Sequence, residues 1–169
     1  MEDWHRGGSG HAAGMERPTY SLRAATPADE AFLFRLYQST REEELSGWDP
    51  QLRAGFLTMQ FAAQQRGHRG AYPAAERSII ELKGEPVGSF LAHRGNAQLR
   101  LVDLALLPEA RGLGIGGSLV QELIQEAAAA GRVFALQVAC TNRARNLYQR
   151  LGLRVIADDG VYASMERAP

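Results

Sequence analysis

Apolar residues recur every three to four positions in two early segments of the chain, which is the spacing of one helix face. Each segment follows a start signal, Thr26-Pro27-Ala28-Asp29 or Asp49-Pro50, in which a capping side chain precedes a proline suited to the first turn. The apolar residues are Phe32, Leu33, Leu36 and Tyr37 in the first segment and Leu52, Phe56, Met59 and Ala63 in the second. We predict two helices, joined by the charged segment 41–48.

Shorter apolar runs bounded by turn residues predict strands. Lys83-Gly84-Glu85 is the turn of a hairpin, and Gly95-Asn96 is a turn before a longer, more apolar strand. The run 133–138 is almost entirely apolar, as expected of a central strand covered on both faces. The predicted strands are 20–24, 78–82, 86–93, 98–106, 133–138, 153–157 and 161–166.

Two further helices are predicted in the second half of the chain. One spans about 114–130, with an apolar face that includes Leu119 and Leu123, and a short one spans about 143–151. The succession of strand, helix and strand between residues 98 and 138 is a parallel crossover unit. The pattern therefore predicts the α/β class, with a mixed sheet.

Length and composition indicate one globular domain. The chain has 169 residues, of which 45% are hydrophobic and 22% charged, and this is enough apolar material for a core. Residues 1–17 are rich in Gly, His and Ser and show no periodicity. We expect them to be a disordered tail before a domain at 18–169, with Met15 as an alternative start.

Charge and cysteine content exclude several classes of protein. The formal net charge of +0 gives no long-range attraction to nucleic acid or to an anionic membrane. Cys140 is the single cysteine, so no internal disulfide forms, and no apolar run is long enough to span a membrane. The four histidines are too dispersed for a metal site. We therefore expect a cytoplasmic protein with no metal and with neither nucleic acid nor a membrane as partner.

The strongest functional signal is the segment Arg111-Gly112-Leu113-Gly114-Ile115-Gly116-Gly117, which lies between an apolar strand and an amphipathic helix. A helix start presents free backbone N–H groups and a partial positive charge, and glycines let an anion approach them closely. The segment therefore predicts a site for a phosphate-bearing ligand, most simply a pyrophosphate.

Other phosphate-binding motifs fit this segment less well. Gly112, Gly114 and Gly117 also satisfy G-x-G-x-x-G, but the dinucleotide fingerprint needs a carboxylate at the end of the next strand. Here that strand is followed by Ala139-Cys140-Thr141-Asn142, which contains no carboxylate. No lysine follows the glycines, which excludes a P-loop. A nucleotide-dependent oxidoreductase is therefore disfavoured.

Two segments resemble motifs of the GNAT acetyltransferase superfamily. Residues 104–116, with Pro108 before Arg111-Gly112-Leu113-Gly114-Ile115-Gly116, are similar to its central motif, a strand and a proline followed by R/Q-x-x-G-x-G/A at a helix start. Residues 142–153 resemble its next motif, N-x-x-A-x-x-L-Y-x-x-L-G-F. Asn142 lies one residue closer to Tyr148 than in the commonest form, so either Asn142 or Thr141 fills the asparagine role, and Leu153 replaces the phenylalanine.

The resemblance implies the GNAT acyl-CoA N-acyltransferase fold, a central mixed sheet flanked by about four helices, with acetyl-coenzyme A as co-substrate. The strand before the glycine turn would pair with the pantetheine, and the amides of the turn would hold the pyrophosphate. The implied cofactor-binding residues are Leu104, Ala105, Leu106, Arg111, Gly112, Leu113, Gly114, Ile115, Gly116, Gly117, Asn142 and Tyr148.

Direct attack of an amine on the thioester needs a base and profits from an acid. The resemblance places the acid at Tyr148, although Ala144, Leu147, Tyr148 and Leu151 form an apolar helical stripe that is also typical of core. Strand alternation puts Asp103 on one face with Leu99, Leu101 and Ala105, where it is either the base or a buried structural acceptor.

Further acceptor-site candidates come from the charged segment between the first two helices, which borders the acceptor in this family. Glu42, Glu43 and Glu44 are alternative bases, and Arg41 is a candidate for binding an acceptor carboxylate. The leading hypothesis is an enzyme that acetylates a small-molecule amine or a peptide amine. A catalytically silent acetyl-coenzyme A-binding module is the alternative, and a homodimer is left open.

Overall fold

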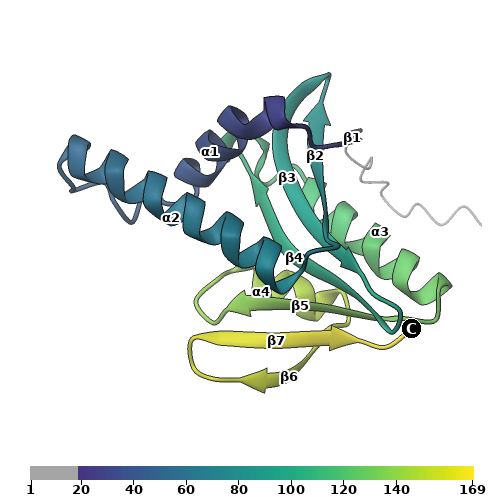
Figure 1. Ribbon diagram of the computed structural model, residues 1–169. Coiled ribbons are helices and arrows are strands. Elements are labelled where there is room, and N and C mark those ends of the chain that lie inside the picture. The colour runs from purple at the N-terminus through teal and green to yellow at the C-terminus, as the bar shows by residue number, and fades with distance from the viewer. Residues whose placement is uncertain (1–18) are drawn as a thin grey trace, which may run out of the picture.

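The computed structural model describes residues 19–169, so the tail predicted for residues 1–17 lies outside its described part. One mixed sheet runs through this part, with the strand order β1-β2-β3-β4-β5-β7-β6 (Figure 1). The strands are β1 Ser21–Ala24, β2 Glu76–Leu82, β3 Glu85–Arg94, β4 Gln98–Leu106, β5 Val133–Ala139, β6 Arg154–Asp158 and β7 Tyr162–Arg167. Each predicted strand is present.

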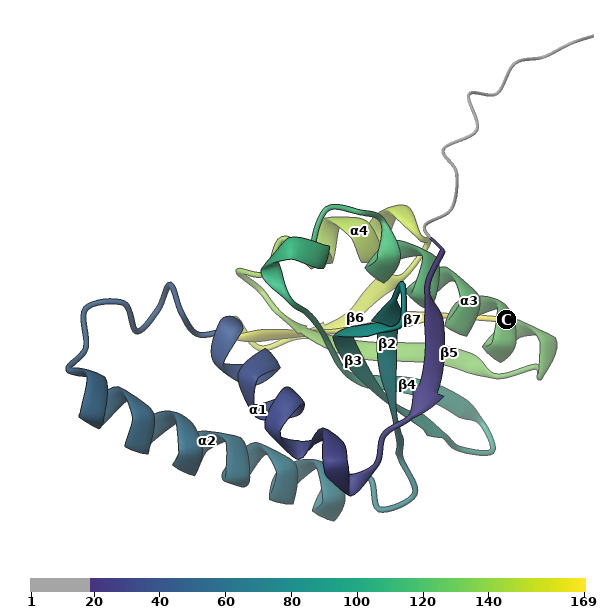
Figure 2. The same ribbon diagram turned by 90° about the horizontal axis from the view of Figure 1, so that it is seen from above.

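The helices cover the two faces of the sheet. α1 and α2 lie over one face and α3 and α4 over the other, as the view from above shows (Figure 2). They span Glu30–Ser39 in α1, Pro50–Ala71 in α2, Ile115–Ala129 in α3 and Ala144–Arg150 in α4, with short 3₁₀ turns at Pro27–Asp29 and Pro108–Ala110. The prediction of an α/β fold with a mixed sheet and about four helices is confirmed.

Local side-chain chemistry starts the first two helices as the sequence predicts. The Asp29 carboxylate accepts the Thr26 backbone N–H at 2.7 Å, and Arg23 of β1 binds both of its oxygens. These bonds hold the pKa of Asp29 well below its usual range and fasten β1 to α1. The Asp49 carboxylate likewise accepts the N–H groups of Gln51 and Leu52, which caps α2.

The sheet contains a single parallel pair. β4 and β5 run side by side in parallel, and α3 connects them as a crossover, whereas each other neighbouring pair in the described sheet is antiparallel. The main core lies between this part of the sheet and α3, and contains Leu99, Leu101, Ile115, Leu119 and Phe134. A smaller cluster of Phe32, Leu36 and Ile79 packs α1 on the opposite face.

The structure corrects the apolar face that we predicted for α2. Leu52 and Met59 are 69% and 58% exposed, whereas Leu57 is buried at 2%. The reason is the length of the helix: its first half extends beyond the edge of the sheet, so no strand lies beneath it (Figure 1). Leu57, which lies in the same half, is buried because it faces the end of α1 and the α1–α2 connection, beside Gln38 and Trp48.

The structure also corrects the face predicted for Asp103. β4 pairs with β3 through Leu101↔Ala92 and Asp103↔Leu91, so Val102 is an extra residue, a β-bulge. Leu99 and Leu101 lie in the core on the α3 side, but Asp103 and Ala105 turn toward α1 and α2. The bulge breaks the alternation on which the prediction rested.

Gly88 of β3 provides a test of this packing. A Cβ at Gly88 would lie 2.5 Å from Leu106 Cδ2 and 2.7 Å from the Ala105 carbonyl oxygen of β4. We expect Gly88→Ala to cost about 1–3 kcal/mol of stability, because the backbone of β4 must move. Thermal unfolding followed by circular dichroism measures the loss.

Gly55→Ala in α2 is the matched control, because nothing lies within 4 Å of the added Cβ. Alanine is the better helix former, so this variant should gain about 0.5–1 kcal/mol. Equal unfolding temperatures for the two variants would contradict the close approach of β3 to β4.

Candidate functional site

The only parallel pair of the described sheet opens into a cleft. β4 and β5 pair from Gln98↔Val133 to Leu101↔Leu136 and no further, although β4 continues to Leu106 and β5 to Ala139. Each strand keeps its other neighbour, since β4 stays paired with β3 and β5 with β7. The strands therefore diverge after Leu101, and β4 presents unpaired peptide groups to the gap.

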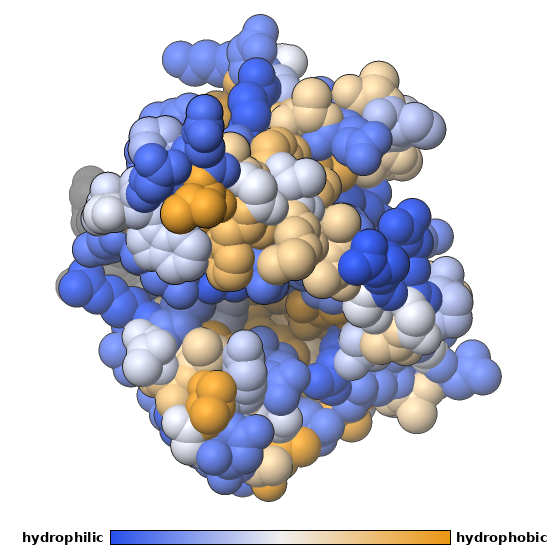
Figure 3. Space-filling view, turned by 60° about the vertical axis from the view of Figure 1, so that its left-hand side comes forward, coloured by the Kyte–Doolittle hydropathy of each residue, from blue (hydrophilic) through white to orange (hydrophobic). Residues whose placement is uncertain are grey.

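The cleft between the diverging strands has a volume of about 420 Å³. Its floor is formed by residues 101–105 of β4 and 136–139 of β5, and its sides include Thr40, Gln64, Tyr148 and Tyr162. In Figure 3 this face of the molecule is hollowed, with hydrophilic and apolar surface around the opening. The cleft is therefore long enough, and mixed enough in character, for an extended ligand.

Several residues predicted for the site come together in this cleft. Of the predicted set, Asp103, Leu104, Ala105, Asn142, Tyr148 and Arg41 line it. Leu106 follows at the end of β4, and its side chain packs against the core. Glu44 does not line the cleft, but its carboxylate binds Arg41 at 3.1 Å.

Tyr148 lies on α4. It belongs to the main core and also lines the cleft. The residue is only 8% exposed. Burial, together with the negative charge of Asp103, raises the pKa of the Tyr148 hydroxyl. The hydroxyl is therefore protonated at neutral pH and is available as a proton donor. Tyr148 is both a core residue and a cleft residue.

Asp103 is held by a guanidinium group from another strand. Arg77 of β2 donates through Nη1 to Asp103 Oδ2 at 3.3 Å and to the Ser89 hydroxyl at 3.0 Å. Burial lowers the pKa of the nearby His68, so its imidazole is neutral at pH 7; Arg77 acts in the same direction and Asp103 in the opposite one. Asp103 is thus part of a charge pair at the wall of the cleft.

The glycine turn leads from the end of β4 into α3, and none of its residues 111–117 is among those that line the cleft. Gly112 and Gly114 have φ of +76° and +82°, values that L side chains rarely adopt, and Gly114 is the N-cap of α3. Among the described residues, the amides of residues 112–117 donate no hydrogen bond. These free donors and the helix start form a site for an anion.

Neighbouring side chains fix this turn in place. Arg111 Nε donates to the Leu106 carbonyl at 2.9 Å, and its Nη2 reaches Ser39 at the end of α1. The Asn142 side chain accepts the Ala144 N–H at 2.9 Å, which closes a turn directly before α4, and Asn142 rather than Thr141 lines the cleft. Arg111 thus joins the turn to β4 and α1, and Asn142 positions the helix that carries Tyr148.

Cys140 is not placed as a nucleophile. Its thiol lies 3.3 Å from Asp158 Oδ1, and burial, with this carboxylate, raises its pKa. A protonated thiol attacks poorly.

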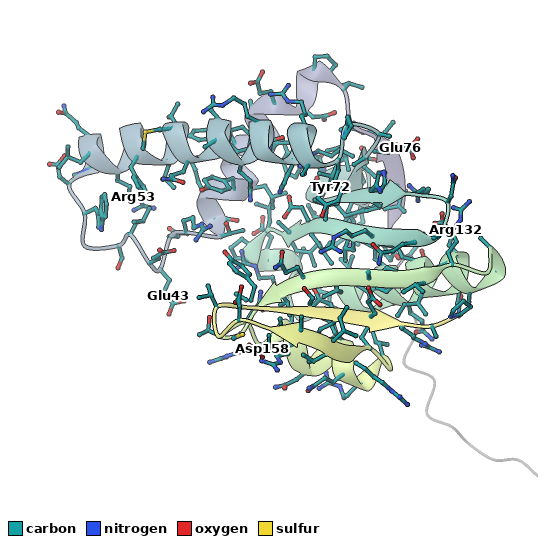
Figure 4. All side chains as sticks on the ribbon, turned by 60° about the horizontal axis from the view of Figure 1, so that its bottom comes forward. Glu43, Arg53, Tyr72, Glu76, Arg132 and Asp158 are labelled. Atoms are coloured by element: carbon teal, nitrogen blue, oxygen red, sulfur yellow. The ribbon has the colours of Figure 1, made fainter. Side chains whose placement is uncertain are left out.

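Glu43 and Asp158 lie toward the same end of the molecule, at the α1–α2 connection and the β6–β7 hairpin (Figure 4). No group of His, Cys, Asp or Glu in residues 19–169 is arranged to hold a metal ion.

Sequence reasoning missed Arg77, His68, Gln64 and Tyr162. These residues come from β2, α2 and β7, far from the two motifs in sequence, and the fold brings them to the cleft or beside Asp103. An arginine at the start of an apolar strand was the only local signal for Arg77.

None of the helices in the described part is long and apolar enough to cross a membrane.

Together these features define an α/β protein whose split sheet and free helix-start amides are suited to an extended, anionic ligand. A family model described as acetyltransferase (GNAT) family matches residues 32–153. The chain therefore belongs to the GNAT acetyltransferase family, whose members transfer acetyl groups from acetyl-coenzyme A. No curated protein matches it in sequence.

Solved structures share the fold at low sequence identity. PaiA N-acetyltransferase from Thermoplasma acidophilum, in complex with coenzyme A, has a TM-score of 0.68 and 16% identity over 89% of this chain and 99% of that one. A histone acetyltransferase HPA2 and related acetyltransferase from Corynebacterium glutamicum gives 0.63 and 22%, over 89% and 96%. A GNAT acetyltransferase from Elizabethkingia anophelis with acetyl-CoA bound gives 0.56 and 14%, over 89% and 98%. The predicted GNAT fold is confirmed.

Gly114 is the position at which the anion site can be tested. We expect Gly114→Asp to weaken the binding of coenzyme A by at least about 100-fold, because a carboxylate at the helix start repels a phosphate and removes the favourable charge of the site. Isothermal calorimetry with coenzyme A measures the change, and circular dichroism checks that the variant folds.

Gly116→Ala serves as the control. Its Cβ would point inward, to Leu106 Cδ1 at 3.7 Å and Leu104 Cδ2 at 4.0 Å, which are ordinary contacts. The affinity for coenzyme A should therefore stay unchanged. Unaltered affinity in a folded Gly114→Asp protein would remove the turn from the binding site.

Proposed function

We propose that this protein is an N-acetyltransferase that moves an acetyl group from acetyl-coenzyme A to a primary amine within a ternary complex. The observation that carries the proposal is the divergence of β4 and β5, which opens a cleft containing both Asp103 and Tyr148. Membership of the GNAT family and the coenzyme A complexes of similar structures support acetyl-coenzyme A as the acyl donor.

The residues of the chain suit the parts of this co-substrate. The free amides of residues 112–117 are suited to the pyrophosphate, and the edge of β4 that faces the gap between Leu104 and Leu106, where the Leu106 carbonyl already accepts from Arg111, is suited to the amides of the pantetheine. A backbone N–H of β4 would also hydrogen-bond to the acetyl carbonyl and stabilise the charge that develops on its oxygen. In this arrangement the thioester lies in the cleft near Tyr148.

The reaction needs two proton movements. The amine nitrogen attacks the thioester carbon, and a nitrogen proton passes to the Asp103 carboxylate. The carbon–sulfur bond then breaks, and the departing sulfur takes the proton of the Tyr148 hydroxyl. The products are an N-acetyl amide and free coenzyme A, and exchange of one proton with solvent restores both residues.

One observation supports the second candidate, a catalytically silent acetyl-coenzyme A-binding module. Arg77 pairs with Asp103, so this carboxylate already has a structural partner in the protein. An assay of free thiol release from acetyl-coenzyme A with polyamines, amino acids, aminoglycosides and peptides separates the candidates. Thiol release that depends on an amine supports the enzyme, and tight binding of acetyl-coenzyme A without release supports the binding module.

Tyr148→Phe tests the proposed acid. We expect kcat to fall by about two orders of magnitude, the low end for general acid catalysis, because water substitutes partly for the hydroxyl. The KM for acetyl-coenzyme A should change little, since the hydroxyl acts in the transition state. Steady-state kinetics give both values. A variant with full kcat and a much lower Tm would instead show that Tyr148 is purely core.

Asp103→Asn tests the proposed base. Asparagine keeps the size of the side chain and can still accept a hydrogen bond from Arg77, but it takes no proton. We expect kcat to fall by about 100-fold or more, with the affinity for acetyl-coenzyme A unchanged. Kinetics and calorimetry on the same preparation measure the two quantities. If kcat persists while Tm drops, Asp103 is a structural partner of Arg77.

A further inference from the structure

A small side chamber opens from the cleft at Asp103. It has a volume of about 40 Å³, lies between α1, α2 and the sheet, and shares Thr40, Gln64, Asp103 and Ala105 with the cleft. Its apolar wall consists of Leu33, Leu36, Tyr37 and Phe61. The chamber is therefore reached from the acceptor end of the cleft, where α1 and α2 border it.

The size of the chamber limits what enters it. A water molecule needs roughly 10–15 Å³ of such volume, so a chamber of about 40 Å³ holds the equivalent of about three waters. A substituent of two or three heavy atoms fits, and an indole or an extended polyamine chain does not. The four apolar side chains line one part of the chamber, and Thr40, Gln64, Gln65, Arg77 and Asp103 line the rest. A short aliphatic substituent packs against the apolar part.

The charges around the cleft and chamber favour an anion beside the amine. Among the described residues that line them, the ionised side chains are Arg41, Arg77 and Asp103, two cations and one anion. Arg77 Nη2 is buried and has no hydrogen-bond partner in the described structure, so this guanidinium is not fully compensated. A ligand with a second ammonium group is therefore disfavoured.

Arg41 is placed to bind that anion. It lines the cleft next to Thr40, and its guanidinium lies 5.7 Å from the centre of the Tyr37 ring. Its present partner, Glu44, is exposed, and exposed ion pairs contribute little to stability. A ligand carboxylate can thus replace Glu44, and a guanidinium binds a carboxylate through two parallel hydrogen bonds.

We propose that the acceptor is a free α-amino acid with a short apolar side chain, a proposal that rests on the proposed function. Its amine lies at Asp103, its carboxylate binds Arg41, and its side chain enters the chamber. The three groups of an α-amino acid diverge from one carbon atom, and the three subsites likewise meet where cleft and chamber join, beside Thr40 and Gln64.

A matched set of amines tests this recognition. Thiol release is measured with 2-aminobutyrate, its carboxamide, 1-propylamine, tryptophan and spermidine, at one pH. We expect kcat/KM for 2-aminobutyrate to exceed that for the carboxamide and 1-propylamine by about 10- to 100-fold. The carboxamide has the less basic amine, so a larger fraction of it is the neutral nucleophile at a given pH. A preference for 2-aminobutyrate over its carboxamide therefore cannot come from amine reactivity. Equal or better turnover of the carboxamide, tryptophan or spermidine overturns the proposal.

Substitution of the arginine gives a second, independent comparison. Arg41→Gln should reduce kcat/KM for 2-aminobutyrate to the level of the carboxamide and leave the carboxamide value unchanged. Arg35→Gln, at an exposed position of α1 outside the cleft lining, is the control and should alter neither value. Full activity of Arg41→Gln with 2-aminobutyrate overturns the assignment of Arg41.

Binding separates this proposal from the proposed function. Calorimetry measures the affinity of the coenzyme A-loaded protein for 2-aminobutyrate and for its carboxamide. Arg41-dependent binding without thiol release from any amine supports the acceptor site and rejects the catalysis. Thiol release with other amines, and no binding of 2-aminobutyrate, rejects the acceptor site and leaves the catalysis intact. Neither binding nor release rejects both.

Discussion

The divergence of β4 and β5 is the constraint on which the rest of the site depends. A paired sheet has no room for a ligand between its strands, because neighbouring strands lie about 4.8 Å apart. Here the parallel ladder ends at Leu101↔Leu136, while β3 holds β4 and β7 holds β5 beyond that point. The two halves of the sheet stay joined by the first part of this ladder and by the packing of α3. The cleft is therefore built into the pairing scheme and does not need a moving element.

The chemistry gathers at this opening because several elements end there. The turn after β4 and the start of α3 present the free amides of residues 112–117, and α4, which follows the turn at Asn142, carries Tyr148. Arg111 joins the end of β4 to the end of α1, which also fixes the side from which Thr40 and Arg41 approach. One arginine thus connects the anion site with the acceptor side of the cleft.

Features that depend on local sequence were predicted well, and features that depend on register were not. The helix starts at Thr26–Asp29 and at Asp49-Pro50, the hairpin turn at Lys83-Gly84-Glu85, and the start of α3 at Gly114 follow from a few adjacent residues. The direction of Asp103 depends on the bulge at Val102, which only the pairing with β3 defines. Arg77 reaches Asp103 because β2 lies two strands from β4, a neighbourhood that no local pattern encodes.

The pairing of Asp103 with Arg77 places a cation beside the proposed base, and this cation assists the reaction. An acceptor amine enters water-exposed sites mainly as an ammonium ion, and only its neutral form attacks. Positive charge nearby lowers the pKa of an ammonium group, whereas a lone carboxylate would raise it. Arg77 lies beside Asp103, and its positive charge favours loss of that proton at the acceptor end of the cleft. The carboxylate of Asp103 then receives the proton from an amine that gives it up readily.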